Sequence, residues 1–278
     1  MNDKQLGRCG DDYIVSFEEK LAYEKNGYIT LRNVLTEAEI QKIEQDFEHF
    51  ISGKVPGMGR DFCDMSGPYD RKFEDFALVN AMLPRKYKPD VANNIYEKFS
   101  ASISRQLIGE DATLDYDQFL AKRPNRPDAK FTLHQDLGYW PTGTPDTITA
   151  TCSLAVDDAN SENGCLYVIP GSHKKGLRVH KPVHGKSSAD RDSSHILGVE
   201  LLDGEALVEL PLNRGDITVH NELILHGSGG NRSESSWRRT YITAFRSKAC
   251  VEYERQIGFT HSHNDKVNWG THLGALKE

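Results

Sequence analysis

The sequence contains no long apolar run, and this absence excludes an integral membrane protein of the helical kind. No stretch approaches the roughly 20 consecutive apolar residues that a transmembrane helix needs. The opening residues, MNDKQLGRCGDDY, also lack the apolar core of a secretory signal peptide. We therefore expect a cytoplasmic protein without a membrane partner.

Cysteine is scarce and is not arranged in closely spaced pairs. None of the five cysteines belongs to a CxxC pattern, which is typical of zinc sites and redox motifs. We expect free and mostly buried thiols at Cys9, Cys63, Cys152, Cys165 and Cys250.

An excess of basic residues is missing as well. The chain has 34 Lys and Arg against 41 Asp and Glu, which gives a formal net charge of -7. Such a surface repels a phosphate backbone, whereas nucleic-acid binders usually carry a basic face. We therefore expect no nucleic-acid partner.

The first part of the chain, up to about residue 110, has the periodicity of helices. Thr36 and Glu39 are spaced as in a capping box, and apolar residues recur at helical spacing after them. Gly27 is a natural helix stop. These signals predict helices over residues 17–26, 37–52 and 88–108, with a short strand over 28–35.

From about residue 111 the pattern changes to short segments rich in β-branched and aromatic residues, separated by Pro, Gly, Asn and Asp. We predict strands over 114–122, 129–136, 147–156, 165–169, 206–210, 215–221 and 238–245. This pattern favours a mainly β sandwich or jelly roll, with the N-terminal helices packed on one outer face.

The whole chain, 1–278, is expected to form one domain. Its jelly-roll core would span about 111–250, and 251–278 would be a C-terminal extension. The polar segment 183–200 predicts a long mobile insertion between strands.

The segment FTLHQD carries the most chemical information. In a strand, residues two apart lie on the same face, so His134 and Asp136 would point together into the barrel. A third ligand is available from His226 in LILHGSGGN or from His220 in ITVHN. Two imidazoles and one carboxylate leave three positions on a metal open, which is typical of non-haem Fe(II) oxygenases. A zinc hydrolase, which needs only one open position, is the alternative.

Four blocks of the sequence together resemble the phytanoyl-CoA dioxygenase family of Fe(II)- and 2-oxoglutarate-dependent oxygenases. The blocks occur in the family's order and are QFLAKRP at 118–124, HQD at 134–136, NGCLYVIPGSHKKG at 163–176, and GDITVHNELILHGSGGNRS with WRRTY after it. The resemblance covers roughly 115–247, together with the N-terminal helix and strand. It implies a double-stranded β-helix, or cupin-like jelly roll, in an enzyme that uses Fe(II), 2-oxoglutarate and O2.

The resemblance also implies the iron ligands. It assigns them to His134, Asp136 and His226, because the family places its distal histidine directly before the Gly-Ser turn, which favours His226 over His220. Related halogenases replace the carboxylate with a small residue, so Asp136 favours hydroxylation. His173 in the block PGSH is expected to be structural.

The distal carboxylate of 2-oxoglutarate needs a buried cation, and a planar guanidinium is the best match. Family members commonly place an arginine eleven residues after the distal histidine, where this chain has Trp237. One extra residue in the turn would restore the alignment to Arg238. Strand alternation lets only one of Arg238 and Arg239 face inward, and we predict Arg238. The resemblance adds Gln118 and Lys122 as polar residues near the cosubstrate.

The glycine-rich, charged segment 57–72 has the composition of an ordered lid. We predict that its charged groups, Arg60 among them, face the substrate cavity and that the segment closes over it. Tyr139 and Trp140 directly follow the metal motif and would form an aromatic wall for an aliphatic chain or an ammonium group.

These observations predict hydroxylation of a C-H bond in a small polar metabolite, with succinate and CO2 as co-products. Amino-acid derivatives and phosphonates fit a chain that has no basic stripe for the phosphates of coenzyme A. An acyl-CoA or secondary-metabolite hydroxylase of the same family, or a non-catalytic cupin-like binding protein, remains an alternative.

Overall fold

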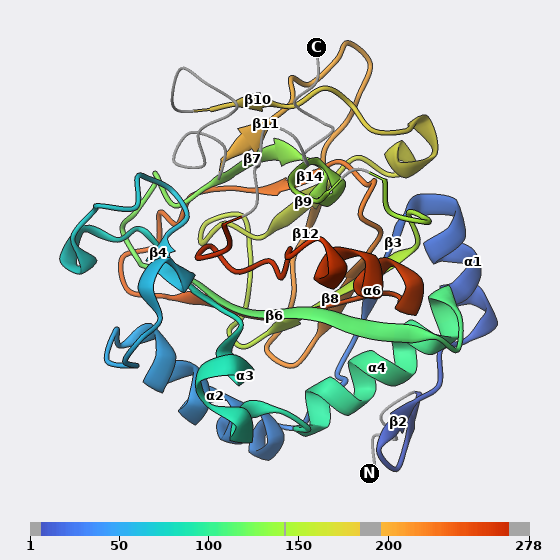
Figure 1. The fold of residues 1–278 in the computed structure, drawn as a ribbon, viewed down its shortest axis with the longest axis horizontal. Helices are drawn as coiled ribbons and strands as arrows, with labels where there is room; N and C mark the ends of the chain where they lie inside the picture. Colours follow the sequence, from blue (N-terminus) through green and yellow to red (C-terminus); the bar gives the residue numbers. More distant parts are fainter. Residues whose placement is uncertain (1–6, 142, 184–195, 267–278) are drawn as a thin grey trace.

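The computed structural model describes residues 7–141, 143–183 and 196–266, and two β-sheets face each other at its centre (Figure 1). In these ranges the larger sheet has seven strands in the order β3-β13-β8-β15-β6-β5-β4. They are β3 (Tyr28–Leu31), β13 (Ile217–His220), β8 (Thr149–Ala155), β15 (Arg238–Ser247), β6 (Ala112–Lys122), β5 (Leu78–Met82) and β4 (Phe62–Asp64).

The smaller sheet has four described strands in the order β12-β9-β14-β7. They are β12 (Val208–Leu210), β9 (Leu166–Val168), β14 (His226–Ser228) and β7 (Phe131–His134). The strand pairs in both sheets are antiparallel. The predicted jelly roll is therefore confirmed. Two short hairpins lie outside it: β1 (Arg8–Cys9) with β2 (Asp12–Tyr13), and β10 (Lys181–Pro182) with β11 (Leu197–Gly198).

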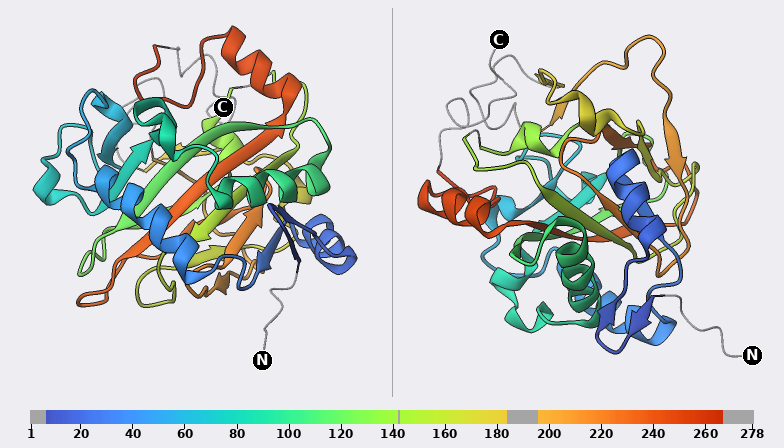
Figure 2. Two further views of the ribbon diagram at one scale, coloured as in Figure 1. Left: turned by 90° about the horizontal axis from the view of Figure 1, so that it is seen from below. Right: turned by 90° about the vertical axis from the view of Figure 1, so that its right-hand side faces the viewer.

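Helices cover the outer face of the larger sheet, as Figure 2 (left) shows for α2 (Glu37–Ile51) and α4 (Ile95–Ile108). Phe47 and Phe50 of α2 pack against Phe119 of β6, with ring centroids 4.6 and 5.5 Å apart. Burying each such ring contributes about 1.5 to 3 kcal/mol. Strand alternation sends Phe119 to this outer core and Gln118 to the interior between the sheets.

The helix starts follow the capping signals in the sequence. In α1 (Phe17–Asn26) and α2, complete capping boxes form at Ser16 and Thr36. The start predicted for the third helix was wrong, because α4 begins at Ile95 rather than near residue 88. Pro89 belongs to a separate 3-10 turn, and the Asn94 side chain caps α4 by accepting the Glu97 N-H at 3.0 Å.

The segment 57–72 differs from the predicted lid. It contributes β4 to the edge of the larger sheet, which sequence analysis missed together with β5. The Asp64 carboxylate accepts the N-H groups of Ala77 and Leu78, and Asp61 accepts the Ser262 hydroxyl. The prediction that the charges of this segment face the cavity is wrong, because these two buried carboxylates make folding contacts. Of residues 57–72, Met65 is the one that lines the central cavity.

The C-terminal part of the chain returns to the space between the sheets. After α6 (Lys248–Gln256), residues 257–266 run back across the interior, as the red segment of Figure 1 shows. Residues from 251 onward were predicted only as a C-terminal extension. The short helix α3 (Pro84–Tyr87) follows β5.

Other predictions about the chain have mixed outcomes. All five cysteines are free, and four of them are buried. The predicted insertion lies mainly in 184–195, outside the described residues, and its flanks pair as β10 and β11. In the described part of the chain, no helix is long and apolar enough to cross a membrane.

Candidate active site

A cavity of about 160 Å³ lies between the two sheets. Alternate residues of three neighbouring strands face it, because successive side chains of a strand point to opposite faces. These residues are Tyr116, Gln118 and Leu120 of β6, Thr151 and Ser153 of β8, and Arg238, Thr240 and Ile242 of β15.

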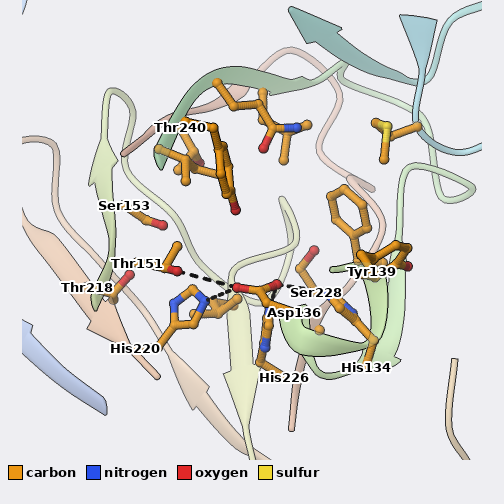
Figure 3. Close-up of a pocket in the computed structure, with 18 of the residues that line it drawn as sticks. His134, Asp136, Tyr139, Thr151, Ser153, Thr218, His220, His226, Ser228 and Thr240 are labelled. Carbon is orange, nitrogen blue, oxygen red and sulfur yellow. Dashed lines mark hydrogen bonds and ion pairs between the residues drawn. The ribbon is translucent and has the colours of Figure 1, made fainter. Parts of the chain in front are cut away.

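His134, Asp136 and His226 meet at one wall of this cavity (Figure 3). His134 ends β7 and His226 begins β14, and the pairing of these strands places the two histidines opposite each other. Their Nε2 atoms lie 3.7 and 3.4 Å from Asp136 Oδ1. The potential ligand atoms of all three residues lie within 4.8 Å of one another. A single metal ion fits between such atoms.

The way in which His134 and Asp136 converge differs from the sequence argument. β7 ends at His134, and Asp136 begins a short 3-10 helix instead of continuing the strand. Gln135 fixes this turn, because its backbone N-H donates to His180 Nε2 at 2.9 Å and its side-chain amide donates to Leu223 O at 2.7 Å. The strand predicted over residues 129–136 is therefore too long.

The two histidines are oriented by backbone carbonyls. His134 Nδ1 lies 2.7 Å from Thr132 O, and His226 Nδ1 lies 3.1 Å from Ile224 O. Because a carbonyl oxygen only accepts hydrogen bonds, each Nδ1 carries the proton and each Nε2 keeps a lone pair. This tautomer is the one that binds a metal through Nε2.

The carboxylate of Asp136 is ionised in spite of its burial. Burial raises its pKa, but the contacts with His226, His134 and His220 outweigh that effect and hold the pKa well below its usual range. Two neutral imidazole nitrogens and one carboxylate oxygen fit Fe(II) and leave positions for further ligands.

His220 stands on the other side of Asp136. Its Nε2 donates to Asp136 Oδ2 at 3.1 Å, whereas His134 and His226 face Oδ1. Thr151 Oγ1 also reaches Oδ2, at 3.5 Å. His220 therefore supports the carboxylate from the larger sheet and does not belong to the group of ligand atoms that surrounds the common point.

Arg238 and Arg239 point to opposite sides of β15. Arg238 is 6% exposed, lines the cavity, and has no hydrogen-bond or ion-pair partner among the described residues. Burial lowers its pKa to about 10. Arg239 instead lies on the outer face and forms ion pairs with Asp157, Glu44 and Glu48, which raise its pKa although burial opposes this.

Lys122 and Gln118, the other two residues suggested for the cosubstrate, occupy different positions. Lys122 lies opposite Arg238 in the strand register and donates to Ser228 Oγ at 2.6 Å and to Gly229 O. Burial and the neighbouring guanidinium hold its pKa well below the usual range. Lys122 thus reaches the cavity through Ser228, whereas Gln118 lines it and donates to Asn80 Oδ1 at 2.6 Å.

The aromatic residues suggested for the substrate do line the cavity. Tyr139 packs edge-on against His134, with ring centroids 5.5 Å apart, and its hydroxyl accepts the Leu197 N-H at 2.8 Å. Trp140 is 4% exposed and lies 4.8 Å from the guanidinium of Arg246.

Arg60 is not among the residues that line this cavity. It lies over the ring of Tyr69 in an adjoining surface depression. The Tyr69 hydroxyl lies 2.7 Å from Nδ1 of His263, which borders both the depression and the cavity. Tyr69 and His263 thus lie between Arg60 and the predicted substrate site.

The turn blocks around His134, Asp136 and His226 have structural roles. The Ser172 hydroxyl accepts the Leu225 N-H at 2.8 Å and so positions His226. Gly164 has φ +83°, and a Cβ there would lie 2.2 Å from the carbonyl oxygen of Gly229, in the turn after β14. Position 164 therefore requires glycine, because that turn approaches it closely. The imidazole of His173 binds the carbonyl of Glu24, in agreement with a structural role.

The C-terminal segment brings three residues to the cavity that the sequence did not predict there, namely Phe259, His261 and His263. The only local signal was the pair of histidines in THSHND. A signal of this kind does not reveal which surface the histidines will meet, because the contact depends on the return of the chain after α6.

Comparison with known proteins identifies the family. A family model described as phytanoyl-CoA dioxygenase (PhyH) matches residues 23–240. Human peroxisomal phytanoyl-CoA dioxygenase is 25% identical over 252 residues, which cover 86% of this chain and 71% of that protein. A probable alpha-ketoglutarate-dependent hypophosphite dioxygenase of Stutzerimonas stutzeri is 25% identical over 224 residues, covering 78% and 73% of the respective chains.

A solved structure with the same fold is EvdO2 from Micromonospora carbonacea var. aurantiaca, complexed with 2-oxoglutarate. It aligns with a TM-score of 0.66 at 22% identity and covers 84% of this chain and 91% of that chain. With the family model matching most of the sequence, the chain belongs to the phytanoyl-CoA dioxygenase family of Fe(II)- and 2-oxoglutarate-dependent oxygenases.

Proposed function

We propose that this enzyme hydroxylates a C-H bond of a small polar metabolite and converts 2-oxoglutarate to succinate and CO2. The observation that carries the proposal is Arg238, a buried guanidinium without a partner in the described structure, in the same cavity as the two histidines and the carboxylate. A buried charge costs several kcal/mol unless it is paired. The distal carboxylate of 2-oxoglutarate would supply the missing partner.

His134, Asp136 and His226 would hold Fe(II), which in such a site supplies the activation of O2 that protein side chains do not provide. His220 and Thr151 fix the orientation of the Asp136 carboxylate through its second oxygen. Backbone carbonyls keep both imidazoles in the tautomer that presents Nε2.

The residues around Arg238 would receive the cosubstrate. Its guanidinium would bind the distal carboxylate in bidentate fashion. Lys122 would hold Ser228 in place, and Gln118 would supply a further polar contact on the same strand face. The apolar and aromatic walls of the cavity would exclude bulk water from the reacting groups.

A small substrate is supported by the size and charge of the site. The cavity is about 160 Å³, and the chain carries a net charge of -7. A coenzyme A thioester would favour a basic stripe near the opening for its phosphates. Among the relatives, the protein from Stutzerimonas stutzeri is named for hypophosphite, a small anion, whereas the human protein is named for phytanoyl-CoA.

The test is succinate formation by the purified protein with Fe(II), 2-oxoglutarate and O2. The panel should contain amino acids, aminophosphonates, betaine-like compounds and acyl-CoA thioesters, with His226→Ala as the inactive control. We expect stimulation by a small polar compound. Turnover of the thioesters alone would contradict the proposed substrate class. The absence of both succinate formation and 2-oxoglutarate binding would instead favour a non-catalytic binding protein.

A further inference from the structure

A second group of buried ionisable residues borders the cavity away from the proposed iron ligands. His261 Nε2 lies 2.7 Å from Asp115 Oδ2 of β6 and 3.4 Å from Glu254 Oε2 of α6. All three residues are at most 5% exposed. Because Asp115 and Glu254 accept hydrogen bonds when ionised, His261 presents Nε2-H to them.

The same contacts favour the charged form of His261. Burial lowers the pKa of the imidazole, but the Asp115 carboxylate and the hydrogen bonds to both acids outweigh burial, so the pKa is raised. The cations that face this group are Arg255, 2.6 Å from Asp115 Oδ1, and Arg246, 2.6 Å from Glu254 Oε1. In the charged form both nitrogens of the His261 ring carry protons.

The other nitrogen of His261, Nδ1, has no hydrogen-bond partner among the described residues. The residue lines the cavity, and its ring is surrounded by Tyr116, Trp140 and Phe259 at centroid distances of 4.4, 5.5 and 4.6 Å. Nε2 of the imidazole therefore contacts two acids. The remaining donor, Nδ1-H, lies in a part of the cavity wall that is otherwise formed by aromatic rings.

The backbone at this position is also unusual. His261 has φ +64°, in the left-handed region that residues with a Cβ seldom adopt. Asp61 maintains this conformation, because its carboxylate accepts the Ser262 hydroxyl at 2.8 Å and the His263 N-H at 2.7 Å. Strained residues that their surroundings hold in place often serve a site.

A second metal ion is the competing explanation, since Asp115, Glu254 and His261 bring potential ligand atoms within 4.8 Å. The guanidinium groups of Arg255 and Arg246 already occupy an oxygen of each carboxylate. A divalent cation would have to stand beside both of these positive charges, which disfavours a metal at this place.

His261 is also well separated from the proposed 2-oxoglutarate site along β6. Its neighbours Asp115 and Tyr116 lie near one end of the strand, and Lys122, opposite Arg238, lies at the other. Six residues of a strand span roughly 20 Å. One molecule of 2-oxoglutarate bound to Arg238 would therefore leave His261 available for the substrate.

We propose that His261 recognises the substrate, donating a charge-assisted hydrogen bond from Nδ1 to an anionic group of a small acid while the surrounding rings hold its carbon chain. This inference rests on the proposed function and assigns its substrate class. The shared chemistry is an oxyanion, so carboxylates and phosphonates are both admitted.

The test observes His261 directly in the protein loaded with Zn(II), as a diamagnetic substitute for iron, and with 2-oxoglutarate. Histidines labelled with ¹⁵N are followed by NMR during titration with propionate, methylphosphonate and, as the neutral control, propionamide. The His261 signals are assigned by their loss in His261→Gln. We expect the Nδ1 signal to shift saturably with the two acids and not with the amide.

Two variants distinguish the roles of the two ring nitrogens of His261. In His261→Gln the amide takes the place of Nε2 and keeps the contact with Asp115, but the Nδ1 donor is lost. In His261→Asn the amide takes the place of Nδ1, and asparagine tolerates the positive φ. We expect acid binding to weaken at least about tenfold in the glutamine variant and to be partly retained in the asparagine variant, with the affinity for 2-oxoglutarate unchanged in both. His173→Gln is the matched control.

The outcomes distinguish this inference from the proposed function. If 2-oxoglutarate binds but neither acid shifts Nδ1, or if both His261 variants bind the acids as the wild type does, the role of His261 is wrong and the proposed function stands. A second equivalent of Zn(II) that His261→Gln fails to bind would show a metal site instead. If 2-oxoglutarate itself does not bind, the proposed function fails first.

Discussion

The two faces of the larger sheet differ in whether the arginine that β15 places there has a partner. On the outer face, under α2 and α4, aromatic rings pack closely and Arg239 is paired with three carboxylates. On the inner face, Arg238 is buried without a partner in the described structure, and His261 has one ring nitrogen without one. The protein itself supplies the partners of Arg239, whereas Arg238 would be paired by a bound ligand.

The contrast is sharpest between two adjacent residues of one strand. Arg238 and Arg239 have the same side chain and nearly the same place in the chain, yet one is desolvated and alone and the other is paired. A native protein rarely retains an unpaired buried charge without a functional reason. The inner face thus gives up stability that binding of a cosubstrate would restore.

The largest effect is expected from a change at the proposed metal site of the inner face. His226→Ala removes one of the three proposed ligand atoms, so we expect iron affinity and activity to fall by more than about 100-fold, beyond the loss typical of residues that only support a ligand. Metal content after dialysis and succinate formation measure the two effects. His220→Ala should retain one equivalent of iron, and loss of the metal from that variant would count against the proposed ligand set.

The outer face should respond in stability rather than in ligand binding. Phe99 of α4 is fully buried in the core between the helices and the sheet. Phe99→Ala should lower the free energy of unfolding by about 3 to 5 kcal/mol, because it leaves a cavity in that core. Urea denaturation measures the loss. The Michaelis constant for 2-oxoglutarate should not change in the folded fraction, and a large rise would show that the two faces are not independent.

The cost of the unpaired guanidinium can be measured by removing it. Arg238→Met should raise the free energy of unfolding of the ligand-free protein, by about 1 to 4 kcal/mol, since a hydrophobic residue replaces a buried charge. Added 2-oxoglutarate should then stabilise the Fe(II)-loaded wild type but not the variant. Lower stability of the ligand-free variant would mean that Arg238 is paired in solution.

The smallest effect on stability is expected from the Asn94 cap of α4, on the outer face of the larger sheet. Asn94→Ala removes the side chain that caps α4, so the free energy of unfolding should fall by about 1 kcal/mol. Asn94→Asp, which can still accept the Glu97 N-H, should lose much less. Equal losses in the two variants would show that the cap does not determine where α4 begins.

The sequence supported those parts of the structure that depend on local patterns. The capping box at Thr36 follows from the spacing of Thr36 and Glu39, and most strands of the jelly roll follow from residue patterns and turn residues. Strand alternation indicated that only one of Arg238 and Arg239 faces inward. The resemblance to the family favoured Arg238 and identified the blocks that carry His134, Asp136 and His226. The roles of these residues in binding iron and 2-oxoglutarate remain predictions.

The parts that were missed depend on contacts between distant segments. β4 and β5 carry no clear alternation because both of their faces are covered, and Asp61 and Asp64 are buried by partners far along the chain. His261 reaches the cavity only because the chain turns back after α6. The turn at Gln135, which brings Asp136 to His134, depends on His180 and Leu223.

The most direct test is the dissociation constant of 2-oxoglutarate for the Fe(II)-loaded protein, measured by calorimetry without O2 in the wild type, Arg238→Ala and Arg239→Ala. Losing a buried charge pair costs about 3 to 5 kcal/mol, so binding to Arg238→Ala should weaken more than about 100-fold. Arg239→Ala should bind within about twofold of the wild type, because its partners lie on the outer face. Equal affinities in the two variants, or the weaker binding in Arg239→Ala, would contradict the assignment of the inner face to the cosubstrate.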